Sequence, residues 1–330
     1  MSKNNKQPTM KDVSRLAGVS LGTVSKVFNG IPVGDDYKAK VEAAAKTLGY
    51  QVNAYARGLR ASKTNTVALI FPNLINPFYS NMADLCCQLL YKRGYRTLIA
   101  TTSYDYHQEQ EMVDMVQQNK VDGIIAITYN PDLVINEDIP FVIIDRKFNN
   151  HNVPCISSDN FAGGSLAAQK LVEAGCKNLL FLGISSHVPG EADKRPLGFD
   201  HYCNANNIKH TVHSVFDEDG VEDIFSFIEE NCTNGSFNYD GIFCNTDQLA
   251  LHAINKLGDL GVAIPQDVQI IGYDGIKRFG SDTYFCSTIK QPLEDMAKIA
   301  VDTLLSEDIT NSSALICLPV EYCYGKTTKK

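Results

Sequence analysis

The stretch TMKDVSRLAGVSLGTVSKVFNG, residues 9–30, sets the fold of the N-terminal part of the chain. Thr9 followed three residues later by Asp12 is typical of a capping box, and apolar residues then recur at helical spacing. Gly18 permits a tight turn, and Ser20 can cap a second short helix. Two short helices separated by a glycine turn predict a helix-turn-helix, whose second helix enters the major groove of DNA.

A third helix follows, with Asp35 or Asp36 as its cap and Gly49 as its terminator. Its apolar positions fall on one face: Tyr37, Val41, Ala44 or Ala45, and Leu48. Three such helices close a small core. The pattern alone also fits a plain helical bundle with no DNA-binding role.

The charge distribution favours the DNA-binding interpretation. Residues 1–60 carry ten Lys or Arg and four Asp or Glu, a net charge of +6, whereas the other 270 residues carry 20 basic and 34 acidic residues, a net charge of −14. Nucleic-acid affinity comes largely from basic side chains that neutralise phosphates. We therefore expect only the N-terminal segment to contact DNA.

Residues 9–30, together with KVEAAAKTLGYQVNAYARGLR at 40–60, resemble the head and hinge of the LacI/GalR family of transcription regulators. This resemblance implies that Leu21, Gly22 and Lys26 occupy base-reading positions. It also implies a second set, which holds the DNA backbone or neighbouring bases: Ser20, Thr23, Ser25 and Asn29.

The residue types at these positions depart from the family pattern, which commonly has hydrogen-bonding side chains at the first two. Lys26 can donate to guanine O6 and N7, whereas Leu21 offers only apolar contact, and Gly22 has no side chain to read a base. We expect specificity to rest on Lys26 and on DNA shape.

Residues 51–61, QVNAYARGLRA, are expected to form a hinge helix. The segment is shorter than the roughly 12 residues that an isolated helix needs, and Gly58 weakens it further, so we expect it to fold on DNA. In the family this helix lies in the minor groove and a leucine wedges between base pairs. The resemblance assigns that role to Leu59, with contacts from Asn53, Ala56, Arg57 and Arg60. A simple interdomain linker is the alternative.

From Thr66 onward, short apolar runs alternate with helical segments. VALIF at 67–71, DGIIAI at 122–127 and FVIID at 141–145 begin the series, and NLLFLGI at 178–184 begins a second one. This alternation predicts parallel sheets with helical crossovers, arranged in two α/β lobes. Ligands bind at the carboxyl ends of parallel strands, so a crevice between the lobes is the expected site.

Motifs throughout this body extend the family resemblance to residues 9 through about 328: NPF (76–78), VDGII (121–125), TDQLA (246–250), IPQDVQIIGYD (264–274) and STIKQP (287–292). The implied fold is an all-α three-helix head and hinge helix, joined to a two-lobed periplasmic-binding-protein-like body with parallel sheets. The expected domains are residues 1–50, 51–61 and 62–330. Within the body, we expect a first lobe at 62–173 and 291–316, and a second lobe at 174–290 and 317–330.

The resemblance also implies a set of ligand-binding residues: Phe78, Tyr79, Asp159, Glu191, Arg195, Thr246 and Asp274. An aromatic face with a convergent arginine and aspartate suits a polyol. Thr246 replaces an asparagine that some sugar-responsive members use. Tyr79 could equally be a core aromatic and Glu191 a solvated loop charge, and Pro196 affects where the helix that carries Arg195 begins.

Several function classes are disfavoured. The ten cysteines are scattered without metal-ligand or disulfide spacing, and no HExxH, GxSxG, P-loop or GxGxxG-after-strand motif occurs, so we expect no metal, no cofactor and no enzyme activity. The polar N-terminus and the lack of an 18-residue apolar run predict a cytoplasmic protein with no membrane association. A transport-type solute-binding protein would have a signal peptide and no head.

The sequence therefore predicts a repressor of sugar-utilisation genes. We expect it to bind a pseudo-palindromic operator as a homodimer under the control of a small sugar-like effector. The chain ends soon after its last strand, with no leucine heptads that could build a tetramer. Control by a phosphorylated phosphocarrier protein, instead of a sugar, is the alternative that the sequence leaves open.

Overall fold

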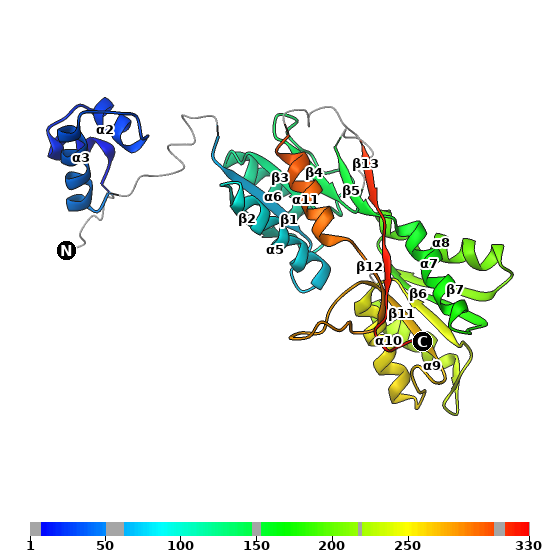
Figure 1. Ribbon diagram of the computed structural model, residues 1–330. Helices are drawn as coiled ribbons and strands as arrows, with labels where there is room; N and C mark the ends of the chain where they lie inside the picture. The colour runs from blue at the N-terminus through cyan, green and yellow to red at the C-terminus, as the bar shows by residue number, and fades with distance from the viewer. Residues whose placement is uncertain (1–7, 51–62, 147–152, 217–219, 307–313, 330) are drawn as a thin grey trace, which may run out of the picture. The chain divides into compact units, whose positions relative to one another are not determined.

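The computed structural model describes residues 8–50, 63–146, 153–216, 220–306 and 314–329. The chain divides into two compact units, residues 1–64 and 65–330, which are called the head and the body below. Figure 1 shows the helices of the head in blue and the strands and helices of the body from cyan to red.

The head consists of three helices: α1 (Met10–Ala17), α2 (Leu21–Phe28) and α3 (Asp35–Leu48). Thr9 begins α1 with the predicted capping box. Val13, Val24 and Val41, one from each helix, are completely buried and form the centre of the core. Tyr37 was predicted to share the buried face of α3, but it is 54% exposed because it lies in the first turn of α3, at the edge of this small core. The head therefore has the predicted helix-turn-helix fold.

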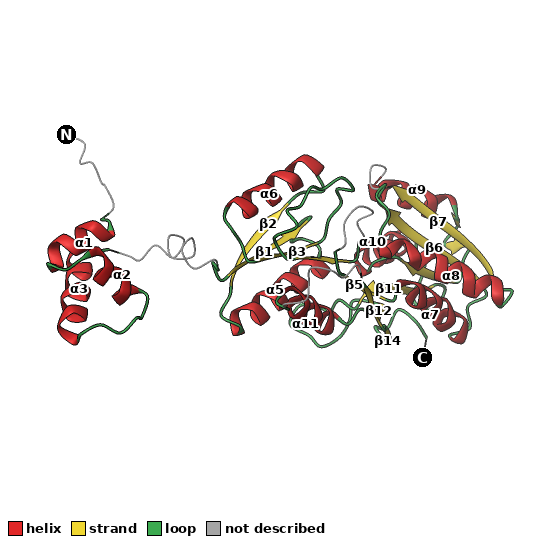
Figure 2. Ribbon diagram, turned by 90° about the horizontal axis from the view of Figure 1, so that it is seen from above, coloured by secondary structure: helices red, strands yellow, loops and turns green. Residues whose placement is uncertain are grey.

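The first of two six-stranded sheets in the body has the strand order β13-β5-β4-β3-β1-β2, with all pairs parallel. Its strands are β1 (Thr66–Phe71), β2 (Arg96–Thr101), β3 (Gly123–Ala126), β4 (Phe141–Ile144), β5 (Cys155–Ser158) and β13 (Leu315–Leu318). Three helices cover it: α5 (Pro77–Lys92), α6 (Tyr106–Gln118) and α11 (Leu293–Leu304). Because successive side chains of a strand point to opposite faces, Val67 and Leu69 pack with α5 and α11, whereas Ala68 and Ile70 pack with α6. Figure 2 shows α6 on one side of this sheet and α5 and α11 on the other.

The second sheet has the order β14-β12-β11-β10-β6-β7 and is parallel except for β14, which pairs antiparallel with β12. Its strands are β6 (Asn178–Ser185), β7 (Lys209–Phe216), β10 (Gly241–Cys244), β11 (Gln269–Asp274), β12 (Ser287–Lys290) and β14 (Glu321–Cys323). Its helices are α7 (Asn160–Glu173), α8 (Lys194–Ala205), α9 (Gly220–Glu230) and α10 (Asp247–Asp259), and the 3-10 turn η1 (Glu191–Asp193) precedes α8. A two-stranded hairpin, β8 (Cys232–Thr233) with β9 (Ser236–Phe237), follows α9. Leu179 and Phe181 pack with α7 and α8, and Leu180 and Leu182 pack with α9 and α10.

The chain crosses between the two sheets after β5, after β12 and after β13, as the ribbon in Figure 1 shows. Each sheet with its helices forms one lobe. The expected lobe boundary at residue 173 is wrong, because α7 packs through Ala167, Ala168 and Leu171 against the second sheet. The first crossing therefore lies directly after Ser158, and β13 extends the first lobe to Leu318.

The strand β7 was not predicted, because it lies at the edge of the sheet, where most of its side chains are exposed or half-buried, and the segment has no continuous apolar run. The short strand β12 was missed for a different reason: STIK contains only one apolar residue, although most of the strand is buried. Among the described residues, no helix is long and apolar enough to cross a membrane.

Candidate functional site

The exposed face of α2 carries the residues predicted to contact DNA. Ser20, Leu21, Gly22, Lys26 and Asn29 are exposed, and Leu21 keeps 41% of its accessible surface. The remaining two of the set are half-buried: Thr23 and Ser25. Val24 is the buried residue of α2, and the exposed Leu21, Lys26 and Asn29 remain accessible to a DNA groove.

The beginning of α2 is fixed by its own polar side chains. Ser20 Oγ accepts a hydrogen bond from Thr23 N at 3.0 Å and lies 2.9 Å from Thr23 Oγ1. A Cβ atom at Gly22 would meet only Ser20 Oγ, at 3.6 Å, which is an ordinary contact. The fold would therefore accept a side chain at position 22, and glycine there is not a structural requirement.

The predicted hinge contacts lie outside the described residues: Asn53, Ala56, Arg57, Leu59 and Arg60.

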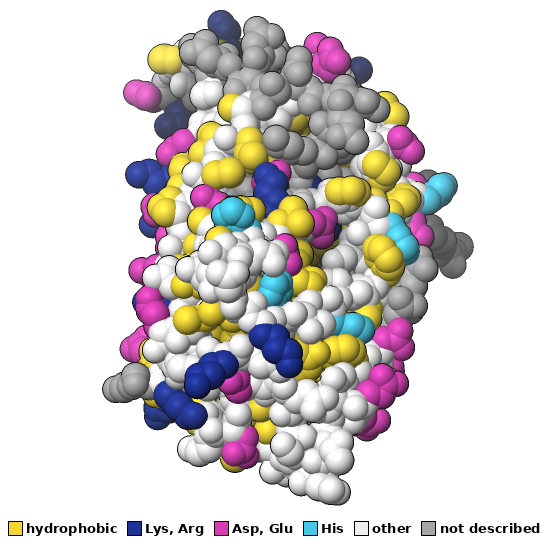
Figure 3. Space-filling model, turned by 90° about the vertical axis from the view of Figure 1, so that its right-hand side faces the viewer, with side chains coloured by type: hydrophobic (Ala, Val, Ile, Leu, Met, Phe, Trp, Pro, Cys, Tyr) yellow, Lys and Arg dark blue, Asp and Glu magenta, His cyan; other side chains and the backbone are white. Residues whose placement is uncertain are grey.

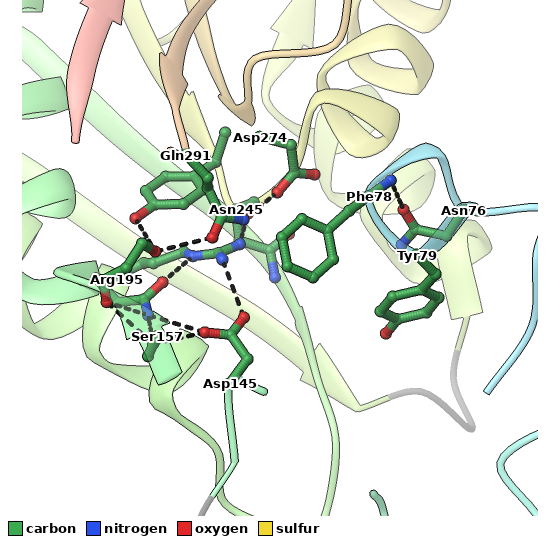
Figure 4. Close-up of polar contacts among 12 residues, drawn as sticks. Asn76, Phe78, Tyr79, Asp145, Ser157, Arg195, Asn245, Asp274 and Gln291 are labelled. Carbon is green, nitrogen blue, oxygen red and sulfur yellow. Dashed lines mark hydrogen bonds and ion pairs between the residues drawn. The ribbon is translucent and has the colours of Figure 1, made fainter. Parts of the chain in front are cut away.

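In the body, the first and second lobes together line a cavity of about 120 Å³. Five of the seven predicted ligand-binding residues line it: Phe78, Tyr79, Arg195, Thr246 and Asp274. Figure 4 shows how Arg195 and Asp274 converge with Phe78 and Tyr79, which come from the other lobe. Strand ends of both sheets supply most of the polar lining, as expected for parallel α/β sheets.

Arg195 lies in the first turn of α8, and its side chain is 4% exposed. Its Nε donates to Asn160 Oδ1 at 2.7 Å and one guanidinium nitrogen donates to Asn245 O at 2.6 Å. The other lies 3.9 Å from a carboxylate oxygen of Asp145, and the guanidinium stacks 3.7 Å above the ring of Tyr273. Because Pro196 also falls in the first turn, where proline is tolerated, it leaves the aim of Arg195 unaffected.

Close helix packing also holds Arg195 in place. A Cβ atom at Gly164 on α7 would lie 2.0 Å from Arg195 O, and one at Gly198 on α8 would lie 1.9 Å from Phe161 O. Only glycine permits backbones to approach this closely. Gly164 and Gly198 therefore set the distance between α7 and α8.

Two acidic residues of the cavity have left-handed backbone conformations: Asp145 at φ +64° and Asp274 at φ +123°. Such strain in residues other than glycine is concentrated at functional sites. Ser157 Oγ donates to Asp145 at 2.6 Å, and Gln291 Nε2 donates to Asp274 at 2.8 Å. Burial raises the pKa of Asp274 to about 6, and the Arg195 guanidinium acts in the opposite direction.

The aromatic side of the cavity begins at α5. Asn76 caps this helix by accepting from Phe78 N at 2.9 Å, and Pro77 follows at the first helical position, which explains the NPF motif. The hydroxyl of Tyr79 lies 3.0 Å from the hydroxyl of Tyr129, and the guanidinium of Arg146 stacks 3.6 Å above the Tyr129 ring. Tyr79 is both a core and a cavity residue, since it packs in the first-lobe core and also lines the cavity.

Two predicted ligand residues do not line the cavity. Asp159 turns back to cap α7, where its carboxylate accepts from Ala162 N at 2.9 Å. Glu191 is 5% exposed and forms an ion pair with Lys194 at 2.5 Å, so it is not a solvated loop charge either. Both carboxylates are already engaged by local partners of their own.

The sequence interpretation missed ten polar or aromatic lining residues: Asn76, Tyr129, Asp145, Arg146, Phe181, Ser185, Ser186, Asp193, Asn245 and Gln291. Asp145, Asn245 and Gln291 each directly follow a strand, namely β4, β10 and β12. The rule that ligands bind at carboxyl strand ends would have identified these three. No comparable signal marks Tyr129, which lies on a longer loop after β3.

The described residues contain no group of three or more His, Cys, Asp or Glu side chains arranged to hold a metal ion. In the face shown in Figure 3, the histidine side chains are spread apart. Five histidines in the second lobe instead contact aromatic rings, the closest being His213, whose ring centroid lies 3.9 Å from that of Phe227.

Comparison with known proteins gives two family matches. Residues 9–53 match "Bacterial regulatory proteins, lacI family", and residues 64–311 match "Periplasmic binding proteins and sugar binding domain of LacI family". The chain is 33% identical to the sucrose operon repressor of Pediococcus pentosaceus, covering 97% of this chain and 99% of that protein. It is 31% identical to the ribose operon repressor of Bacillus subtilis, covering 98% and 99%.

Among solved structures, a periplasmic binding protein/LacI transcriptional regulator from Alkaliphilus metalliredigens, complexed with D-xylulofuranose, aligns with a TM-score of 0.65 and 28% identity. The alignment covers 81% of this chain and 100% of that one. The body, with its cavity between two lobes, therefore resembles a protein that has been seen with a sugar bound.

Proposed function

The chain belongs to the LacI family of bacterial regulatory proteins, and from this we propose that it binds a pseudo-palindromic operator as a homodimer and responds to a sugar in the cavity of its body. It is a sugar-responsive DNA-binding repressor and not an enzyme. The observation that carries the proposal is the convergence of Arg195, Asp274 and Phe78 from two lobes on one cavity, in a chain that also has a helix-turn-helix head.

The chemistry of the cavity suits a neutral sugar. Arg195 supplies donors, Asp145 and Asp274 supply carboxylate acceptors, and Asn245 and Gln291 supply amides that can do both. Adjacent hydroxyl groups need such mixed partners, and a ring of Phe78 can cover the apolar face of a sugar. Thr246 caps α10 by accepting from Leu249 N at 3.1 Å, so its hydroxyl proton remains available to a ligand.

The coupling between sugar and operator follows from thermodynamic reciprocity. If a sugar changes the spacing of the two lobes and thereby weakens operator binding, the operator must weaken sugar binding by the same factor. We propose that the response acts through residues 51–61, because their short length and Gly58 predict a helix that folds only on DNA. Leu59 is the residue we propose as the wedge in the minor groove.

The full-length protein tests this proposal directly. An operator is selected from random DNA, and sugar binding is measured by thermal shift and calorimetry with sucrose, D-ribose and D-xylulose. We expect a two-fold symmetric selected sequence and one sugar that alters DNA affinity. The outcome that refutes the proposal is a selected site without symmetry, or a bound sugar whose affinity is identical with and without operator.

Control by a phosphorylated protein partner is not favoured by any feature of the described residues, and both relatives named above are repressors of sugar operons. A phosphorylated phosphocarrier protein added to the same calorimetric assay distinguishes the two modes of control. Binding of that protein with no response to any of the three sugars would establish the alternative.

A further inference from the structure

Asp247 lies behind the cavity and takes no part in the site described above. It is the first residue of α10, is 2% exposed, and does not line the cavity. Its Oδ2 accepts a hydrogen bond from Ile276 N at 2.7 Å, and its Oδ1 accepts one from Cys286 Sγ at 3.4 Å. A buried carboxyl group with these two partners contacts the segment that carries Asp274.

That segment is a strained turn. Asp274 has φ +123°, which is strained for a residue other than glycine, and Gly275 follows at φ +79°, which glycine adopts readily. Three side chains hold the turn: Asp247 binds Ile276 N, Thr288 Oγ1 accepts from Gly275 N at 3.2 Å, and Gln291 donates to Asp274. A strained conformation persists only where the surroundings determine it, which makes these three bonds the supports for Asp274.

The fold also reserves space for the Asp247 carboxyl group. A Cβ atom at Gly272 on β11 would lie 2.2 Å from Asp247 Oδ1 and 2.9 Å from Cys286 Sγ. Glycine at this position lets the carboxyl group lie directly against the strand, two residues before Asp274. The Cα atom of Asp247 would also lie only 3.1 Å from that Cβ atom, so the contact is part of the packing of α10 on β11.

We propose that Asp247 is a positioning residue of the effector site: it aims Asp274 into the cavity and carries the proton of this buried pair of carboxyl groups. The proposal rests on the effector site proposed above. It adds that effector binding is lost at high pH, when Asp247 ionises behind Asp274.

The surrounding charges explain why the proton belongs to Asp247. Asp247 is affected by the charge of Asp274 on β11 and by hydrogen bonds from Ile276 N, Thr288 and Cys286, and none of these groups is a cation. Those that affect Asp274 include the Arg195 guanidinium, which favours its ionised form, and Asp145, which opposes it. Only one member of the pair therefore has a cation to balance its charge.

The pKa directions agree with this assignment. Burial, followed by the charge of Asp274, raises the pKa of Asp247 to about 8. Burial raises the pKa of Asp274 only to about 6, because Arg195 acts in the opposite direction. A proton held on Asp247 leaves the Asp274 carboxylate able to accept hydrogen bonds from the hydroxyl groups of a ligand.

Asp247→Asn keeps the shape of the side chain and an acceptor for Ile276 N but cannot ionise. With whichever of sucrose, D-ribose and D-xylulose binds the wild-type protein, we expect the wild-type affinity to fall about tenfold from pH 7.5 to pH 9.5, and the variant to change less than about twofold. Asp240→Asn is the matched control, since Asp240 also accepts backbone N–H groups, from Lys177 and Asn178, but does not line the cavity. Equal pH profiles for wild type and Asp247→Asn would overturn the proposal.

A measurement without ligand separates this proposal from the effector assignment. Infrared spectroscopy of the wild type should show a protonated carboxyl band that disappears with a midpoint near pH 8, remains in Asp240→Asn and is absent from Asp247→Asn. If Asp247→Asn does not fold, Cys286→Ser gives the same information, because a hydroxyl donates more strongly than a thiol and should shift the midpoint downward. Absence of the wild-type band at pH 7 overturns the proposal, whereas a normal band without binding of any sugar refutes only the effector assignment.

Discussion

Replacing Gly164 by alanine should unfold the second lobe at a lower temperature and disrupt the effector site. The new Cβ atom would lie 2.0 Å from Arg195 O and 2.9 Å from Phe199 N, both of which are backbone atoms of α8. Ordinary contact begins at 3.4 Å, so α7 and α8 must separate by at least 1.4 Å (3.4 − 2.0). Overpacking of this kind costs about 3 kcal/mol, which corresponds to a decrease of roughly 6–12 °C in Tm for a domain of this size.

Gly258→Ala is the matched control for this experiment. Gly258 lies in α10 of the same lobe and has nothing within 4 Å of an added Cβ atom, so alanine there should stabilise the helix by about 0.5–1 kcal/mol. Differential scanning calorimetry measures both Tm values, and calorimetry with the effector sugar measures binding. We expect Gly164→Ala to lose stability and sugar binding together, because the displaced atoms belong to Arg195. Equal Tm values for the two variants would refute the reasoning.

Three further outcomes are expected. Lys26→Ala should relax base preference at one operator position and weaken operator binding by about 1–3 kcal/mol, measured in competition assays against single-base operator variants. A uniform loss of affinity for all sequences would instead mean that Lys26 contacts only phosphate. Arg195→Met should abolish the sugar-induced thermal shift, whereas Asp159→Asn, which keeps the cap of α7, should retain it; loss of the shift in both would return Asp159 to the ligand site. Burial lowers the pKa of His213, so the unfolded chain binds more protons than the folded chain, and the free energy of unfolding should fall as pH decreases below about 6.5. His213→Gln should reduce the dependence of this free energy on pH, measured by urea titrations between pH 5 and pH 7.

The head shows how far local rules extend. The capping box at Thr9 and Asp12, the turn at Gly18 and the cap at Ser20 all form as the sequence predicts, because each depends on residues within five positions of one another. Tyr37 is the exception. Helical spacing places Tyr37 on the apolar face of α3, but it cannot show that the small core ends before the first turn of that helix, where Tyr37 is exposed.

The body shows where those rules fail. Arg195, Thr246 and Asp274 line the cavity as predicted, whereas Asp159 does not, although it also follows a strand. The difference is local competition: the Asp159 carboxylate is taken by the amide of Ala162, while a left-handed backbone turns Asp145 at the end of the neighbouring strand toward Arg195. Sequence spacing cannot determine which of two adjacent strand ends faces the ligand.

The sequence by itself determined the helix-turn-helix, the alternating pattern of two α/β lobes and five of the residues that line the cavity. These follow from caps, periodicity and strand ends, which act over short distances along the chain. Only the tertiary structure decided that α7 belongs to the second lobe, and that Asp247 supports Asp274 from behind. Both depend on contacts between segments that are distant in sequence. Gly164 and Gly272 allow these segments to approach closely, and the buried charged groups must find their partners across the same contacts.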